Sequence, residues 1–479
     1  MGLKGGHLMK RACLILLVGV LGLAGGGVAF AAGAGGAEIT GLDESFGSGG
    51  WAATPLSAEE GDRFRAVAVG EEGQVYAAGF LTEGGDQAMA LARIGTGGAL
   101  DESFGESGVA SVNVTEGGEA GELASGLAVQ STGNIVIGGP TEHDPEAEGD
   151  AARDLDIAIS RFDDSGALDS TFGEEGTTVL DLSTGVLVPP PAGSTSDPQF
   201  VGDTMWGVTA MPDDSLLVVA AKLADGDDRT DRDFALVKLT ADGALDTSFG
   251  TEGMVILDVN EGSESPRQAI VQPDGKILMA GYSRDGEGVV RPVLVRMAGD
   301  GTLDETFGEG GIATAEILPA VAEAYDVAMQ GEDYVIAGYG RAADGEPVDL
   351  IAARFTADGT WDETFGEGGL VRLDIAGEDD RARDLVALPD GRLLLAGSGK
   401  PTEDDINGML VLLGPDGAFD ESFGENGHLV VDLGGPNDSF YGVALTPDGA
   451  HAMIVGWKGS GEETDGDDAV VARVATAGT

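Results

Sequence analysis

The chain has 479 residues, of which 84 are acidic and 26 are basic, so its net charge at pH 7 is −58. This balance excludes nucleic acid as a partner, because phosphate binding needs clustered Lys and Arg, and it disfavours anionic membrane surfaces for the same reason. The 81 glycines and the aromatic content of 5% favour many tight turns over long helices.

Residues 1–31 have the features of a secretory signal peptide: a positively charged start, an apolar run over 12–30 and the cleavage site Ala29-Phe30-Ala31. Cleavage near Ala31 would leave residues 32–41 as a short linker. The mature protein would be secreted, periplasmic or on the cell surface, without a membrane span and with a charge of −61 from 23 basic and 84 acidic residues. The alternative is an uncleaved anchor, since the apolar run nears the length of a membrane span.

Residues 42–479 consist of one unit repeated seven times, and each copy carries the motif Asp-x-Ser/Thr-Phe-Gly. The phenylalanines follow one another at spacings of 58, 68, 77, 58, 58 and 58 residues. The motif residues are Asp43, Phe46 and Gly47; Asp101, Phe104 and Gly105; Asp169, Phe172 and Gly173; Asp246, Phe249 and Gly250; Asp304, Phe307 and Gly308; Asp362, Phe365 and Gly366; Asp420, Phe423 and Gly424.

Each unit contains four short apolar runs separated by turns. In the clearest unit they cover residues 267–272, 276–281, 292–297 and 311–317. Runs of this length, rich in Val, Ile and Leu and bounded by Gly and Asp, indicate strands. The sequence therefore predicts an all-β fold: a seven-bladed β-propeller of four-stranded antiparallel blades, in which each blade buries both faces against its neighbours.

The recurring motif has a structural explanation. Asp304 can cap the backbone of a single turn, Phe307 can pack between sheets, and Gly308 can adopt the positive φ that ends the turn. The alternative makes the seven aspartates a ring of ligands.

The two ends of the repeat region differ in phase by one strand. The chain begins with a motif and a strand-like tail to Leu56, and it ends at residues 469–474, the third run of a unit. We expect residues 49–56 to close the last blade as its outer strand, because this leaves no open sheet edge. The alternative is seven complete blades counted from the N-terminus.

The Leu-Asp-x-Ser/Thr-Phe-Gly-x-x-Gly element, together with Pro-Asp-Gly-Lys-Ile-Leu-x-Ala-Gly, resembles the delta-60-repeat family of bacterial exported proteins over residues 40–474. Two units depart from this pattern, since Asp213-Asp214-Ser215 and Gly331-Glu332-Asp333 replace Pro-Asp-Gly, which leaves their turn type open. The resemblance implies a propeller-like fold and no particular activity.

The loops on one face of the predicted propeller vary in length, and both long insertions, 140–155 and 183–203, fall on that face. Variable loops on a rigid scaffold are where binding sites usually lie. One register position at the start of the first strand carries Ser125 and six large side chains: Arg65, Trp206, Arg267, Tyr325, Arg383 and Tyr441. We interpret these six as a ligand site at the channel mouth for a protein, peptide or glycan. The alternative is packing between blades, with arginine stems covering apolar surface.

Catalytic signals are sparse, since His143, His428 and His451 are scattered, and the only cysteine lies in the signal segment. We therefore predict a monomeric binding or scaffold protein that is not an enzyme and has no cofactor. The alternatives are a structural surface protein and a propeller hydrolase or oxidoreductase. The Ca²⁺ candidates are Asp225, Asp227, Asp228 and Asp231, a cluster that matches the known calcium loop only in part.

The charge predicts that stability depends on salt. Repulsion among 84 acidic side chains should weaken as ionic strength rises. We expect the melting temperature to increase from low to molar NaCl, measured by differential scanning calorimetry. A full increase with millimolar CaCl₂ alone would instead indicate specific carboxylate sites, and no response to either salt would reject both explanations.

Overall fold

The computed structural model describes residues 39–57, 61–115, 121–143, 154–188, 199–226, 229–260, 262–459 and 466–476. The predicted signal peptide, and the linker up to residue 38, lie outside these residues. Within them the chain is all β, as predicted: strands are joined by turns, and no helix is long and apolar enough to cross a membrane.

The strands follow the repeat along the chain. The first two sheets contain β2 (Arg63–Val69), β3 (Val75–Glu83), β4 (Asp86–Ile94), β5 (Val109–Val112), β6 (Gly126–Val129), β7 (Ile135–Glu142), β8 (Leu155–Phe162) and β9 (Thr177–Leu180). The next two repeats contain β12 (Thr204–Ala210), β13 (Leu216–Leu223), β14 (Arg232–Leu239), β15 (Met254–Leu257), β16 (Ser263–Val271), β17 (Ile277–Arg284), β18 (Val290–Met297) and β19 (Ile312–Thr314). The remaining repeats contain β20 (Val321–Gln330), β21 (Asp333–Arg341), β22 (Asp349–Phe355), β23 (Val371–Leu373), β24 (Arg381–Ala387), β25 (Leu393–Thr402), β26 (Asp405–Leu413), β27 (His428–Val431), β28 (Ser439–Leu445), β29 (His451–Lys458) and β30 (Asp468–Ala475).

Neighbouring strands of each repeat pair antiparallel. The described strands form five four-stranded sheets, one eight-stranded sheet and a two-stranded sheet. The eight-stranded sheet consists of β16–β19 and β20–β23, joined by a single parallel bridge between Val290 and Val321.

The N-terminal strand pairs with the last strand of the chain. β1 (Trp51–Ala53) lies antiparallel to β30, with Trp51 opposite Ala472. The Thr54 backbone N–H extends the pairing with a hydrogen bond of 2.7 Å to the Ala469 carbonyl oxygen. Both ends of the repeat region thus lie in the sheet β28–β29–β30–β1, which is the pairing expected from the phase offset.

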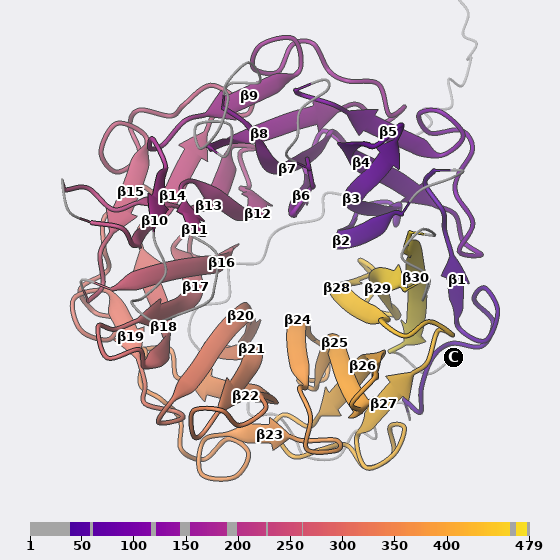
Figure 1. The fold of residues 1–479 in the computed structure, drawn as a ribbon, viewed down its shortest axis with the longest axis vertical. Coiled ribbons are helices and arrows are strands. Elements are labelled where there is room, and N and C mark those ends of the chain that lie inside the picture. Colours follow the sequence, from indigo (N-terminus) through magenta and orange to yellow (C-terminus); the bar gives the residue numbers. More distant parts are fainter. Residues whose placement is uncertain are drawn as a thin grey trace, which may run out of the picture. The chain divides into compact units, whose positions relative to one another are not determined.

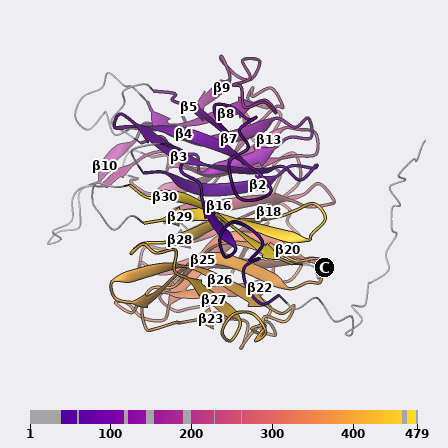
Figure 2. The ribbon, with the colours of Figure 1, turned by 90° about the vertical axis from the view of Figure 1, so that its right-hand side faces the viewer.

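Figure 1 shows the sheets of residues 39–476 side by side, with the first strand of each repeat nearest a common centre. Each first strand contacts the next, and β28 contacts β2. β10 (Val186–Val188) and β11 (Gln199–Val201) form a hairpin in the longer insertion, and Figure 2 shows β10 at one side, beyond the main group of strands. The proline run of this insertion and residues 144–153 of the other lie outside the described residues.

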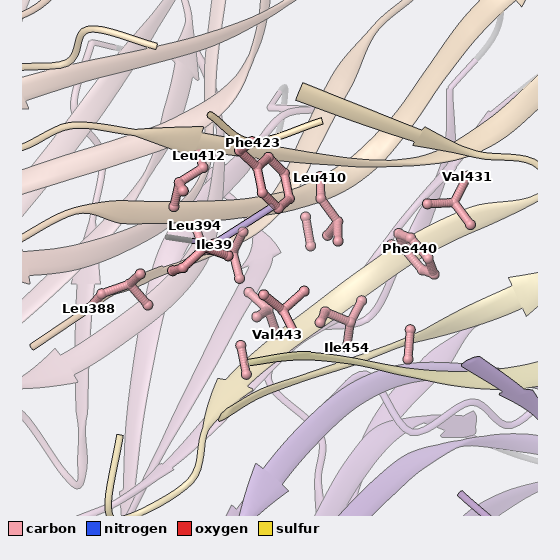
Figure 3. Packing of buried hydrophobic residues seen from close by; sticks show 14 of the residues in the cluster. Ile39, Leu388, Leu394, Leu410, Leu412, Phe423, Val431, Phe440, Val443 and Ile454 are labelled. Atoms are coloured by element: carbon pink, nitrogen blue, oxygen red, sulfur yellow. The ribbon is translucent and has the colours of Figure 1, made fainter. Parts of the chain in front are cut away.

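The hydrophobic core lies between neighbouring sheets. In the cluster of Figure 3, Leu410 and Phe423 from the β24–β27 sheet pack with Phe440 of the next sheet. A similar cluster joins the last sheet to the first, where Phe46 lies with Val455 and Phe64. Each sheet therefore buries apolar side chains on both faces, which a lone four-stranded sheet cannot do.

The Asp-x-x-Phe-Gly motif performs its three predicted tasks. The Asp304 carboxylate accepts a 3.1 Å hydrogen bond from the Thr306 backbone N–H. Every motif phenylalanine is at most 1% exposed, and the motif glycines have φ values between 52° and 61°. The prediction of a capped turn with a buried phenylalanine is confirmed.

The motif also fastens each sheet to the next one. The Gly308 N–H donates to the Asp358 carbonyl oxygen in the following repeat (2.8 Å). Arg296 pairs with Asp304 at 2.9 Å and lies 4.6 Å from the centroid of the Phe307 ring. The motif carboxylate is thus engaged by a cation on its own sheet, which favours the structural role over a ring of ligands.

Deleting residues 42–56 should lower stability sharply. The deletion exposes the edge of β30 and removes Phe46 from its cluster; loss of one buried phenylalanine typically costs about 3–5 kcal/mol. Thermal unfolding of the mature chain measures the effect. Replacing the β10–β11 hairpin by a flexible linker is the control, because that hairpin is a separate two-stranded sheet. An unchanged melting temperature after deletion of residues 42–56 would contradict the closure by β1.

Candidate functional site

A β-bulge places each of the six predicted site residues. The register between the first and second strands shifts by one residue at this position, so that one extra residue stands in the first strand. The extra residues are Arg65, Trp206, Arg267, Tyr325, Arg383 and Tyr441. Bulges re-aim side chains, and here they turn one residue of each strand toward the centre.

In five of the six bulged repeats a glycine in the second strand makes room for the bulge, and in the repeat of Trp206 the residue there is Ala220. A Cβ atom at Gly79 would lie 1.8 Å from the Arg63 carbonyl oxygen, and one at Gly338 would lie 1.9 Å from the Glu323 carbonyl oxygen. These glycines belong to the repeated Ala-Gly pair of the second run. The Ala-Gly pattern in the sequence is therefore a signal for the bulge on the neighbouring strand.

The bulge residues surround one cavity. Its volume is about 120 Å³, and Ser125 lines it together with all six predicted residues. Ser125 stands directly before β6, and its backbone N–H donates to the Gly138 carbonyl oxygen (2.9 Å). The structure thus brings together every residue of the predicted register position.

The six large side chains form an alternating stack of cations and aromatic rings. Distances from guanidinium carbon to ring centroid run from 3.6 Å for Arg267 over Trp206 to 5.4 Å for Arg383 over Tyr441. Arg267 also lies 4.1 Å from the Tyr325 centroid, and Arg65 lies 4.8 Å from that of Tyr441. Such contacts are attractive, and more so when the cation is shielded from water.

The stack is interrupted at Ser125. Its short side chain lies between Arg65 and Trp206 in the order of the first strands, where the other repeats have a large group. Arg65 and Trp206 are consequently the two ends of the stack.

Several buried N–H groups of the stack have no hydrogen-bond partner among the described residues: Arg65 Nε, Trp206 Nε1, Arg267 Nε, Arg267 Nη1 and Arg383 Nε. Arg65, Arg267 and Arg383 also form no ion pair with a carboxylate within this part of the chain. Arg267 instead donates to the hydroxyl groups of Tyr282 (3.0 Å) and Tyr325 (3.1 Å). Because unsatisfied buried donors are costly, the site is suited to accept an anionic or oxygen-rich group.

The next register position adds a second feature that sequence reasoning missed. Gln268, Asp326 and Asp384 line the same cavity and are linked by side-chain hydrogen bonds. The Asp384 carboxylate also accepts a hydrogen bond from Val443 N–H of the following repeat (2.7 Å). Burial raises the pKa of Asp326 and of Asp384, and the neighbouring Asp326 carboxyl group raises the pKa of Asp384 further. Three polar residues in aligned positions directly after the bulge could have revealed this network.

A buried carboxylate stands three residues before the bulge in six repeats: Asp62, Glu122, Asp203, Glu264, Asp380 and Asp438. In most of them it holds the preceding loop, as Asp203 does by accepting a 2.6 Å hydrogen bond from Leu182 N–H. Asp380 likewise accepts from Ile375 N–H (2.7 Å). Burial raises the pKa of Asp203 and of Asp380 to about 6.

The opposite ends of the first strands enclose a larger cavity. Its volume is about 490 Å³, and the turns after β2, β6, β12 and β16 line it. Its walls include Val69, Val129, Met211 and Gln272. Adjacent short turns on this face therefore together form a hollow.

Two of the predicted calcium residues pair with cations of the chain. Asp225 pairs with Lys222 (2.7 Å), and Asp231 pairs with Arg229. Asp227 and Asp228 lie outside the described residues. His143, His428 and His451 do not line the central cavity.

Two sequence segments, residues 212–249 and 272–307, match the model of a domain of unknown function described as a beta-propeller (DUF5122). No curated protein matches the chain. Among solved structures, the polysaccharide lyase Uly1 is similar at 12% identity, over 90% of this chain and 92% of that chain, with a TM-score of 0.49. Sqt1 from Chaetomium thermophilum is similar at 12% identity, over 89% and 98%, with a TM-score of 0.39.

The family match and the sheets together show a repeat-built β-propeller. The specific assignment to the delta-60-repeat family stays a prediction. The structural similarities carry no argument about activity.

Stability should fall as the pH rises from about 4 to about 6. Asp203 and Asp380 have folded-state pKa values of about 6 against an unfolded value of 3.8. Their contribution is fully present below about pH 4 and is lost as the pH rises through 6, by at most about 3 kcal/mol each. Unfolding in constant molar NaCl would measure it, and Asp380→Asn should flatten the profile. Stability that rises over this interval would contradict the assignment.

Proposed function

We propose that this protein is an exported, seven-bladed β-propeller that binds an anionic group of a ligand in its central cavity and does not catalyse a reaction. Seven sets of four strands support the blade number, with β1 as the outer strand of the last blade. The contact between β28 and β2 supports closure of the ring. The features of residues 1–31 that are typical of a secretory signal peptide support export.

The observation that carries the proposal is the interruption of the stack at Ser125. If the stack served packing only, a large side chain at position 125 would be favoured, because it would cover the exposed ends of the stack at Arg65 and Trp206. Instead a small side chain leaves space beside Arg65 and Trp206, both of which have a buried N–H group without a partner among the described residues. The gap therefore suits a carboxylate or a similar small anion.

Charge supports the same conclusion. The chain has 84 acidic residues and only 26 basic ones, yet three arginines meet at the cavity without forming an ion pair within the described chain. Arginine binds carboxylate groups through two parallel hydrogen bonds. The acidic surface around the cavity repels a polyanion that contacts a wide area of the protein. A ligand with a single anionic group in the cavity is attracted by the arginines there.

The size of the cavity limits what enters. Its volume of about 120 Å³ is below the roughly 300 Å³ of sites that enclose a drug-sized ligand. We infer that one end group enters, and that the rest of a peptide or glycan lies across the variable loops.

The geometry favours binding over hydrolysis. Asp326 and Asp384 are hydrogen-bonded to each other, whereas glycoside hydrolysis by two carboxyl groups requires a separation of about 5 to 9.5 Å. Both carboxylates also accept backbone hydrogen bonds, Asp326 from Leu385 N–H (2.9 Å) and Asp384 from Val443 N–H (2.7 Å). Each of these hydrogen bonds links one blade to the next.

Filling the gap should abolish binding while the fold stays intact. Ser125→Trp would extend the stack between Arg65 and Trp206 and occupy the space of the anionic group. The mature protein is screened on arrays of glycans and peptides with and without carboxylates, and affinities for the hits are measured by calorimetry. We expect carboxylate-bearing hits and at least a tenfold loss of affinity in Ser125→Trp, with an unchanged or higher melting temperature.

Ser131→Trp is the matched control, because Ser131 lines the cavity at the other end of the strand. It should leave the affinity unchanged. Equal binding of neutral and carboxylate-bearing ligands would contradict the proposal. A loss of affinity in Ser131→Trp alone would move the site to the opposite face.

A further inference from the structure

One of the six buried carboxylates that precede the bulges differs from the others. The other five, in Asp62, Glu122, Asp203, Asp380 and Asp438, accept hydrogen bonds from backbone N–H groups. Glu264 is 1% exposed, and its Oε1 accepts from the Ser283 hydroxyl (2.8 Å). Its Oε2 has no hydrogen-bond partner within the described chain. A buried carboxylate oxygen without a donor is costly unless a cation lies close to it.

Glu264 faces two carboxylates of the preceding sheet. Asp233 lies at the start of β14 and is 5% exposed, and Asp258 directly follows β15. One carboxylate oxygen from each of Asp233, Asp258 and Glu264 lies within 4.8 Å of the other two. The Glu264 carboxylate, one of whose oxygens lacks a donor, therefore belongs to a compact set of three hard ligands contributed by adjacent sheets.

We propose that Asp233, Asp258 and Glu264 bind a calcium ion. Ca²⁺ contacts oxygen at about 2.3–2.6 Å, so one ion can bridge oxygens up to about 5.2 Å apart, and the oxygens of this set lie within that limit. Mg²⁺ is less suited, because it demands near-ideal octahedral geometry and loses its water ligands reluctantly. Three carboxylates supply part of the six to eight oxygen ligands of Ca²⁺, and water completes the shell. This ligand set differs from the Asp-rich loop that the sequence suggested.

Arg229 partly neutralises the outer side of this cluster. Its guanidinium contacts Asp231 and Asp258, and its Nη2 lies 3.2 Å from Asp233 Oδ1. Glu264 forms no ion pair with it. Arg229 is therefore a competitor for the two aspartates, while the buried oxygen of Glu264 is left for the ion.

The equivalent place in the preceding repeat provides an internal comparison. Asp156 near the start of β8 and Asp181 after β9 match Asp233 and Asp258, and there His143 Nδ1 lies 3.0 Å from Asp156. Asp203, which comes three residues before Trp206 as Glu264 comes three residues before Arg267, accepts hydrogen bonds from Leu182 N–H (2.6 Å) and Ser183 N–H (3.1 Å). The carboxylate that stands in the place of Glu264 is thus satisfied without an ion.

Calcium binding is tested by calorimetric titration of the mature protein with CaCl₂ in constant molar NaCl, which screens the overall charge. We expect one high-affinity ion per chain, a higher melting temperature in CaCl₂ than in EDTA, and a smaller effect of MgCl₂. Glu264→Gln should lower the Ca²⁺ affinity at least tenfold. Glu122→Gln, the matched substitution at a satisfied position, should leave it unchanged.

Arg229→Gln provides a second measurement, which does not alter a ligand of the ion. Removal of the competing cation should raise the Ca²⁺ affinity several-fold. Unchanged affinity in Glu264→Gln, an equal loss in Glu122→Gln, or weaker Ca²⁺ binding in Arg229→Gln would each overturn the proposal.

Discussion

The contact between a buried phenylalanine and the turn of the neighbouring sheet is the interaction on which the rest of the structure depends. Four short strands expose two apolar faces, so a sheet is stable only where other sheets cover both. Phe307 fills the space beneath the next turn, and Gly308 N–H donates to that turn. Because each copy of the motif repeats this contact, every sheet is positioned by the one before it, and the N-terminal Phe46 extends the series to the first sheet.

Because the sheets hold the first strands in fixed positions, a bulge in a first strand places a side chain at a defined position near the centre. A shift of one residue in six of the first strands turns side chains such as Arg267 and Tyr325 toward the centre. At these two residues the backbone can approach the second strand because a glycine stands opposite. The same bulges therefore supply both the packing of the inner strands and the residues of the proposed binding site. The stack of arginines and aromatic rings stabilises the inner strands, and its interruption at Ser125 leaves space for another molecule.

The acidic residues serve several distinct purposes. Motif aspartates cap turns and pair with a cation, as Asp304 does with Arg296. Buried ones such as Asp380 anchor loops to first strands. The Asp326–Asp384 pair joins blades around the centre. A uniform explanation of the composition as adaptation to salt covers the surface carboxylates but not these buried ones, whose geometry is specific.

The sequence by itself determined the strands, the Asp-x-x-Phe-Gly turn and the aligned position of Arg65, Trp206 and the other bulge residues, because these features are local and recur at a regular spacing. It could not show that Arg267 is enclosed between Trp206 and Tyr325, nor that Glu264 Oε2 lacks a donor while both oxygens of Glu122 have one. Only the tertiary structure decided these points. Whether a buried group is satisfied depends on atoms from neighbouring sheets, and their distances follow from how the sheets pack rather than from any pattern along the chain.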